Sequence, residues 1–217
     1  MKKKHALVLG ATGATGQEIV KLLLKDSSFD KVSVFVRRNI DIKNEKLNIH
    51  VIDFTKLNDY NKLINGDILF SALGTTLADA GSKKNQYLVD FTYQYEFAKI
   101  ASENGVKTYS LVSSMGANKD SIFFYPKIKG ELEYEINFLN FENIQIFQPP
   151  SLIRQAELMR SGERIGVKLF QTLSSFGILK SLKPIDVSDL AYCMIVESKS
   201  FKKNKIKIYK PQNITRS

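Results

Sequence analysis

Residues 10–16 read Gly-Ala-Thr-Gly-Ala-Thr-Gly, and this stretch decides how the chain begins to fold. A short apolar run at residues 6–9 precedes it, and Ile19, Leu22 and Leu23 follow it at helical spacing. A buried strand, a glycine turn and the start of a helix therefore fall within about twenty residues. This arrangement holds the pyrophosphate of a dinucleotide against the N-terminus of the helix.

The three glycines follow a Gly-x-x-Gly-x-x-Gly spacing, and each has its own role. Gly10 lets the strand turn sharply, and Gly13 lets the backbone approach the pyrophosphate without a Cβ atom in the way. Gly16 lets the helix pack closely on the strand. The hydroxyls of Thr12 and Thr15 can add hydrogen bonds. The stretch predicts a dinucleotide site, with a purely structural turn as the alternative.

The rest of the chain alternates short apolar strands with helices. After the first strand, we expect strands at residues 31–36, 50–54, 67–73, 108–112 and 143–147, and helices at 17–25, 58–64, 86–104 and 126–139. Crossovers of roughly 15–30 residues indicate a parallel sheet with helices on both faces. The predicted fold is α/β, a Rossmann-type doubly wound parallel sheet. It forms a single domain over residues 1–217, with a small substrate-side cap mainly in residues 150–217.

The composition is that of an ordinary globular protein with a basic balance. Of 217 residues, 43% are hydrophobic and 25% are charged, and the net charge is +10. The lysines are scattered and no nucleic-acid motif accompanies them, which favours a solvated surface over a nucleic-acid patch. The single cysteine, Cys193, lies in an apolar run typical of a buried helix and allows no intrachain disulfide. No metal site is expected.

The apolar runs of the sequence do not match a targeting signal or a membrane span. The apolar run after the lysines at residues 2–4 is too short for a signal peptide, and no run approaches the roughly 18 apolar residues of a membrane span. We therefore expect a cytoplasmic protein that contacts neither a membrane nor nucleic acid.

The end of the second strand indicates which dinucleotide binds. NAD-specific sites usually place an acidic residue about twenty positions after the last glycine, where it holds the ribose 2′-hydroxyl. Here that position is Val36, and Arg37 and Arg38 follow it. Two guanidinium groups suit a 2′-phosphate through charge-assisted, bidentate hydrogen bonds. We expect NADP(H) in preference to NAD(H), unless both arginines are merely surface charges. Asp53 is a candidate to accept a hydrogen bond from the adenine amino group.

A candidate reaction centre lies further along the chain. Tyr125 and Lys129 are four residues apart, so they share one helix face. A tyrosine of ordinary pKa, near 10, is a poor acid or base at neutral pH, and a neighbouring ammonium group favours the phenolate and lowers that pKa. Ser113 and Ser114 end the preceding strand, eleven or twelve residues upstream of the tyrosine.

Six motifs occur in order along nearly the whole chain. They cover residues 10–16, 36–38, 71–76, 111–117, 124–133 and 148–152. Together they resemble the atypical short-chain dehydrogenase/reductases of the NAD(P)-binding Rossmann family, and within them the HIV Tat-interactive protein 2 oxidoreductase group. Biliverdin/flavin reductases and NmrA-like regulators are similar in the glycine loop but match the later motifs less well.

The resemblance implies hydride transfer between NADPH and a small carbonyl or alcohol. It makes Tyr125 the proton donor, lets Lys129 also bind the nicotinamide ribose, and gives a serine the role of polarising the substrate oxygen. Ser114 is the first candidate for that serine, because it comes last on the strand, and Ser113 is the second. Conventional members complete the proton relay with an Asn on the preceding helix, and no residue of the 86–104 helix matches it. Asp90, Thr92 and Tyr93 are the nearest candidates.

The same resemblance places the turn at residues 149–151 beside the nicotinamide. The residues expected to contact the cofactor are Gly10, Thr12, Gly13, Ala14, Thr15, Gly16, Arg37, Arg38, Asp53, Phe54, Ala72, Leu73, Gly74, Ser113, Tyr125, Lys129, Pro149, Pro150 and Ser151. The alternative function is a non-catalytic NADP(H)-binding redox sensor or regulator that acts through a protein partner. The chain is expected to be a monomer or a homodimer. The charged stretch at residues 154–164 is either a lid over the cofactor or a solvated helix.

Overall fold

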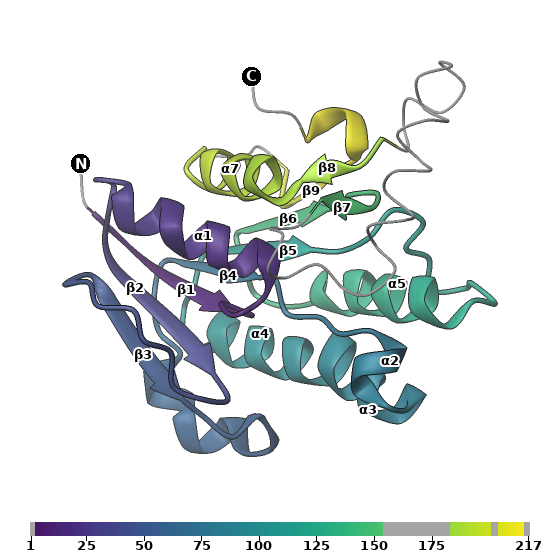
Figure 1. The fold of residues 1–217 in the computed structure, drawn as a ribbon, viewed down its shortest axis with the longest axis horizontal. Coiled ribbons are helices and arrows are strands. Elements are labelled where there is room, and N and C mark those ends of the chain that lie inside the picture. The colour runs from purple at the N-terminus through teal and green to yellow at the C-terminus, as the bar shows by residue number, and fades with distance from the viewer. Residues whose placement is uncertain (1–2, 154–182, 201–203, 215–217) are drawn as a thin grey trace.

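The computed structural model describes residues 3–153, 183–200 and 204–214, and its centre is one parallel sheet (Figure 1). The seven strands lie in the order β3-β2-β1-β4-β5-β6-β9, and every neighbouring pair is parallel. The strands are β1 Lys4–Leu9, β2 Phe29–Val36, β3 Leu47–Val51, β4 Ile68–Ser71, β5 Thr108–Val112, β6 Asn143–Phe147 and β9 Ile206–Tyr209. A separate two-stranded sheet pairs β7 Leu152–Ile153 with β8 Ile185–Asp186. The strand order reverses between β1 and β4, where ligands bind in such sheets.

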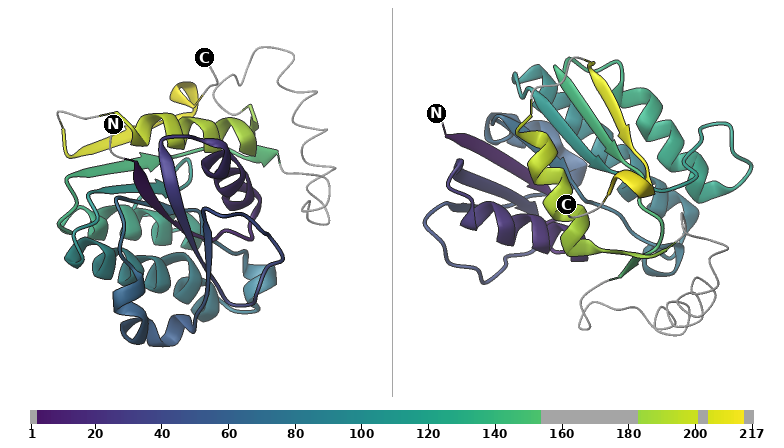
Figure 2. Two further views of the ribbon diagram at one scale, coloured as in Figure 1. Left: turned by 90° about the vertical axis from the view of Figure 1, so that its left-hand side faces the viewer. Right: turned by 90° about the horizontal axis from the view of Figure 1, so that it is seen from above.

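Helices cover both faces of the sheet and make three layers (Figure 2). On one face, α1 (Ala14–Lys25) packs beside α7 (Val187–Ser198). On the other face lie α4 (Tyr93–Glu103), α5 (Phe124–Ile136) and the 3₁₀ segment η1 (Phe54–Leu63). The shorter elements are α2 (Leu77–Ala80), α3 (Lys83–Tyr87), the π-helical turn η2 (Leu88–Thr92) and η5 (Pro211–Asn213).

Two apolar cores lie on opposite sides of the sheet, because successive side chains of a strand point to opposite faces. In β1, Ala6 and Val8 join the core under α1 and α7, whereas Leu7 and Leu9 join the core under α4 and α5. All four side chains are fully buried. The strand therefore reads as a continuous apolar run, which is typical of a parallel sheet covered on both faces.

The predicted fold class is confirmed, with differences in the elements. The third strand is Leu47–Val51 and not residues 50–54. It ends early because the Asp53 carboxylate accepts a hydrogen bond from the Thr55 N–H, 2.9 Å away, and so caps η1. The helix expected at residues 86–104 consists of α3, η2 and α4 in succession. The helix α5 begins at Phe124, two residues before the expected start.

The region after residue 150 contributes to the main sheet. The strand β9 pairs with β6, and α7 packs against α1. Cys193 is buried in α7, as expected from its apolar run. Among the described residues, no helix is both long and apolar enough to cross a membrane. The described part of the chain also holds no group of three or more His, Cys, Asp or Glu side chains arranged for a metal.

Candidate functional site

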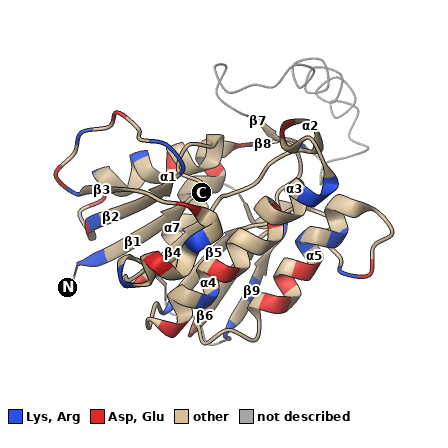
Figure 3. Cartoon of the chain, turned by 90° about the horizontal axis from the view of Figure 1, so that it is seen from below, with Lys and Arg blue, Asp and Glu red and all other residues tan. Residues whose placement is uncertain are grey.

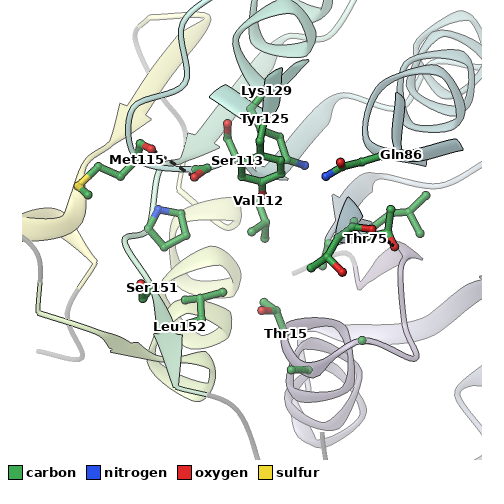
Figure 4. A pocket seen from close by; sticks show the side chains of 18 of the residues that line it. Thr15, Thr75, Gln86, Val112, Ser113, Met115, Tyr125, Lys129, Ser151 and Leu152 are labelled. Atoms are coloured by element: carbon green, nitrogen blue, oxygen red, sulfur yellow. Dashed lines mark hydrogen bonds between the residues drawn. The ribbon is translucent and has the colours of Figure 1, made fainter. Parts of the chain in front are cut away.

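A cavity of about 960 Å³ opens where β1, β4, β5 and β6 end (Figure 4). Its walls are the loops that follow these strands, together with the first residues of α5. The lining includes residues 13–15, 72–77, 112–115 and 149–152. The sequence therefore folds so that five of its six recognised motifs meet at one edge of the sheet, and only the motif at residues 36–38 lies outside the cavity.

The glycine loop has the geometry expected of a pyrophosphate cradle. Gly10 adopts φ +83°, and a Cβ there would lie 2.5 Å from the Ala72 carbonyl carbon. A Cβ on Gly16 would lie 2.0 Å from the Gly10 carbonyl oxygen, so the helix packs directly on the turn. At Gly13 the nearest atom would be 3.4 Å away, which leaves open space on the cavity side. Gly13 is the N-cap of α1 and carries no side chain that could itself cap the helix. These features fit a dinucleotide pyrophosphate.

The residues nearest to the loop divide between cavity and surface. Ala14 and Thr15 line the cavity, and Figure 4 shows Thr15 at the start of α1. Thr12 is exposed and lies outside the lining, with its carbonyl oxygen accepting a hydrogen bond from the Gln17 amide. Ala72, Leu73 and Gly74 form the wall after β4, and Pro149, Pro150 and Ser151 form the wall after β6. The turn is held by a 2.9 Å hydrogen bond from the Met115 N–H to the Pro149 carbonyl.

The residues predicted for the adenosine end lie outside this cavity. Arg37 and Arg38 directly follow β2, are exposed, and form no ion pair with any described residue. The Asp53 carboxylate is exposed, and its hydrogen bonds from Thr55 lower its pKa. Phe54 is buried, with its ring 5.6 Å from that of Tyr93. Its side chain therefore belongs to the core.

Tyr125 and Lys129 project from α5 into the cavity wall (Figure 4). Tyr125 lies in the first turn and is 39% exposed, whereas Lys129 is 3% exposed. The Lys129 Nζ lies 5.8 Å from the Tyr125 ring centroid and 2.9 Å from a carboxylate oxygen of Asp90. Burial opposes the charge on Lys129, but the oxygens of Tyr125, Asp90 and Glu133 together raise the pKa of its ammonium group.

The two serines after β5 have different partners. Ser113 is buried, and its hydroxyl donates a hydrogen bond to the Glu133 carboxylate. The Gln148 side-chain amide donates to both oxygens of that carboxylate, at 3.0 Å each. Burial raises the pKa of Glu133, although Ser113, Gln148 and Lys129 oppose the rise. Among the described residues, the Ser114 hydroxyl has one hydrogen-bond partner, the Met115 carbonyl at 3.3 Å, so its proton is the more available of the two.

The structure adds four polar residues to the predicted site, and of these the sequence analysis had named only Asp90, as one of the nearest candidates for the missing Asn of the relay. Asp90 pairs with Lys129, while Glu133 and Gln148 hold Ser113. Gln86 is 4% exposed, lines the cavity, and its amide has no hydrogen-bond partner among the described residues (Figure 4). Of the other three, only Glu133 had a signal in the sequence, because it lies one helical turn beyond Lys129 on the same face. The charged stretch at residues 154–164 lies outside the described residues.

Comparisons with known proteins agree with this geometry. The family model described as NAD(P)H-binding matches residues 10–134. "Protein FMP52, mitochondrial" of Candida albicans is 35% identical over 192 residues, which cover 84% of this chain and 82% of that protein. Protein HTATIP2 of Rattus norvegicus is 36% identical over 177 residues, which cover 80% of this chain and 73% of that protein. The resemblance drawn from the six motifs is confirmed.

A solved structure extends the likeness of fold to nearly the whole chain. A UDP-N-acetylglucosamine 4-epimerase from Methanobrevibacter ruminantium M1 superimposes with a TM-score of 0.72 at 17% identity, covering 97% of this chain and 77% of that one. At this identity the likeness shows the Rossmann-like fold alone.

One expectation is contradicted. The cytoplasmic location was inferred from the lack of a recognisable targeting signal. The Candida albicans relative and a Kluyveromyces lactis relative, 35% and 37% identical to this chain, are both named as mitochondrial proteins. The prediction of a cytoplasmic location is therefore wrong. Its physical basis was weak, because a missing apolar run excludes only one class of signal.

Proposed function

The chain belongs to the NAD(P)H-binding family, and we propose that it is an NADP(H)-dependent oxidoreductase that interconverts a small carbonyl compound and its alcohol. One observation carries the proposal. Tyr125, Lys129 and Ser114 line the same cavity as the glycine loop and the turn at residues 149–151. A proton donor, a cation and a hydroxyl therefore meet where a nicotinamide bound along these loops would end.

The chain's own residues would handle the proton and the substrate oxygen. NADPH, when bound, supplies the hydride that reduces the carbonyl carbon. Tyr125 would donate its hydroxyl proton to the carbonyl oxygen, and Ser114 would donate a hydrogen bond to the same oxygen. The Lys129 ammonium group would stabilise the phenolate that the proton leaves behind. Ser113 would keep donating its hydroxyl hydrogen bond to the Glu133 carboxylate and hold the end of β5 in place.

The preference for NADP(H) rests on Arg37 and Arg38. Both are exposed after β2 and have no acidic partner among the described residues, so their guanidinium groups are available to a 2′-phosphate. The strand they follow lies next to β1, whose carboxyl end carries the glycine loop. We assign the two arginines to the 2′-phosphate.

A small-molecule substrate is favoured over nucleic acid. Along α4 and α5, positions of acidic residues are interspersed with positions of basic residues (Figure 3). The net charge of +10 therefore does not form one basic patch along these two helices. We expect no binding to duplex DNA even at low salt, where electrostatic binding is strongest.

Tyr125→Phe tests the reaction. NADPH consumption against a panel of carbonyl compounds should fall by about 10²–10⁴-fold, since one general acid is lost. NADPH affinity, measured by fluorescence titration, should change less than about twofold. Tyr134→Phe, an exposed tyrosine of the same helix outside the cavity lining, is the matched control. Retained activity in Tyr125→Phe would refute the assignment of the proton donor.

The alternative function has its own outcome in the same experiment. If the wild-type protein binds NADPH tightly and yet reduces no carbonyl compound in the panel, a non-catalytic redox sensor acting through a protein partner replaces the oxidoreductase. That partner would be sought by comparing complexes formed with and without NADPH.

The cofactor preference is tested by Arg37→Asp combined with Arg38→Ala. Charge-assisted hydrogen bonds contribute about 1.5–3 kcal/mol each, so NADPH affinity should fall by about 10²-fold or more. NADH affinity should change little. Lys43→Asp with Lys46→Ala changes the net charge equally and is the control. An unchanged ratio of NADPH to NADH affinity would overturn the preference.

A further inference from the structure

Lys129 and Asp90 form a buried ion pair beside the proposed proton donor. The Lys129 Nζ lies 2.9 Å from Asp90 Oδ1, and the two side chains are 3% and 0% exposed. They come from different elements, α5 and η2, which pack against each other. A buried charge of either sign is very costly without its partner, so each residue fixes the other.

Asp90 is held in place from several sides. Its second carboxylate oxygen accepts a 3.2 Å hydrogen bond from the Thr75 N–H, in the loop after β4. Its backbone carbonyl accepts a 2.9 Å hydrogen bond from the Gln94 amide, and Gln94 in turn accepts one from the buried Ser71 hydroxyl at 2.7 Å. Both β4 and the loop that follows it therefore position this carboxylate.

The local backbone explains how the carboxylate reaches Lys129. Asp90 is the middle residue of the π-helical turn η2, and such turns inside helices are frequent at functional sites. Gly74 lies against the pair, because a Cβ there would be 3.2 Å from Asp90 Oδ1 and 3.9 Å from Lys129 Nζ. The wall of the cavity is thus shaped around the pair.

We propose that Asp90 is a positioning residue of the reaction: it fixes the Lys129 ammonium group beside Tyr125 and offsets part of the positive charge that Tyr125 experiences. This inference rests on the proposed function in one respect, that Tyr125 is the proton donor. The charged or titratable groups that face Lys129 are Asp90 from η2 and Tyr125 and Glu133 from α5.

The offset has a defined chemical consequence. An uncompensated ammonium group near a phenol favours the phenolate strongly, and an adjacent carboxylate weakens this effect. In carbonyl reduction the donor must carry its proton, so the rate falls at pH values where the phenol ionises. Asp90 would extend the working range for reduction to higher pH, and Lys129 would still stabilise the phenolate that forms in each turnover.

Asp90→Asn tests the inference without any substrate. The protein is labelled with carbon-13 at the tyrosine Cζ atoms, and the Tyr125 signal is identified by its loss in Tyr125→Phe. In Asp90→Asn the midpoint of the Tyr125 titration should move to lower pH by about one pH unit or more. Asp120→Asn, which removes an exposed carboxylate paired with Lys119, should leave the midpoint unchanged. An unmoved midpoint in folded Asp90→Asn would overturn the proposal.

A double variant guards against failure of the single variant to fold. Asp90→Asn with Lys129→Gln removes both charges of the ion pair, and the Glu133 carboxylate keeps its hydrogen bonds from Ser113 and Gln148, so the variant should fold. If Asp90 offsets Lys129, the double variant should show a Tyr125 midpoint within about half a pH unit of wild type. A large upward shift would mean that Lys129 acts uncompensated, and would overturn the inference. Because the titration needs no turnover, it distinguishes this outcome from failure of the proposed reaction.

Discussion

Gly16→Ala and Gly13→Ala should damage the protein in different ways, although the two glycines belong to one loop. A Cβ at position 16 would meet the Gly10 carbonyl oxygen at 2.0 Å, the Gly10 carbonyl carbon at 2.7 Å and the Ala11 Cα at 3.0 Å. All three atoms belong to the backbone, so the clash cannot be relieved by a change of side-chain rotamer. At position 13 the nearest atom would lie at 3.4 Å, which is ordinary contact.

The size of the Gly16 effect follows from these distances. The closest contact is about 1.4 Å short of the 3.4 Å at which ordinary contact begins, so the start of α1 must move away from the turn. A clash of this size with fixed backbone atoms should cost about 3 kcal/mol or somewhat more. The higher helix propensity of Ala over Gly stabilises the helix by about 1 kcal/mol. We expect a net loss of about 2–3 kcal/mol in the free energy of unfolding.

Urea unfolding and NADPH titration together measure the contrast. With a slope of about 2–3 kcal/mol/M for a chain of this size, the Gly16→Ala midpoint should fall by about 1 M. Gly13→Ala should shift the midpoint by less than half as much but weaken NADPH binding at least about tenfold, because its methyl group enters the space assigned to the pyrophosphate. The reasoning is refuted if Gly16→Ala unfolds at the wild-type midpoint, or if Gly13→Ala binds NADPH normally.

Three further predictions concern pH, the serines and the cavity wall. Burial lowers the pKa of His5 to about 4, so its contribution to stability is complete above its unfolded pKa near 6.5 and is lost as the pH falls to about 4. Because the ring is partly exposed, the free energy of unfolding should fall by roughly 1–2 kcal/mol over this range. In His5→Gln the unfolding temperature should therefore change less between pH 7 and pH 4.5 than it does in the wild type. Ser114→Ala should lower turnover by about 10²-fold with unchanged stability, whereas Ser113→Ala should destabilise the fold by about 1–2 kcal/mol, because it removes a buried donor to a carboxylate. Gln86→Leu should raise the KM for the substrate about tenfold and leave NADPH affinity unchanged, and an unaltered KM would exclude a contact between this amide and the substrate.

The parts of the fold that were predicted correctly have strong local signals. The strands β5 and β6 agree residue for residue with the sequence prediction, because each is a short apolar run with a clear end. The strand β3 was predicted three residues too late. The predicted window, residues 50–54, lies mostly beyond the residues that pair with β2, which are Leu47–Val51. The strand β9 was missed because Ile206 and Ile208 alternate with lysine and are partly exposed, and only pairing with the distant β6 makes this segment a strand.

The site was predictable where spacing along one helix decides the geometry. Tyr125 and Lys129 share a face of α5 because they are four residues apart, and both line the cavity. The pairing of Asp90 with Lys129 could not be predicted in this way. It requires the π-helical turn, the packing of η2 on α5, and the absence of a side chain at Gly74. These are properties of three segments that are distant in sequence.

The position of α7 over α1 has a consequence for biosynthesis. Every residue assigned to the cofactor or the reaction precedes residue 152, yet the layer over α1 is completed by residues 187–198. Their Leu190 and Met194 belong to the same buried core as Ile19 and Leu23 of α1. During translation the apolar side of the nucleotide half therefore stays uncovered until residues 187–198 have been made. A nascent chain in this state exposes apolar surface, and exposed apolar surface promotes aggregation. A fragment that ends after the last site residue would keep the complete functional set but should aggregate before it binds a cofactor.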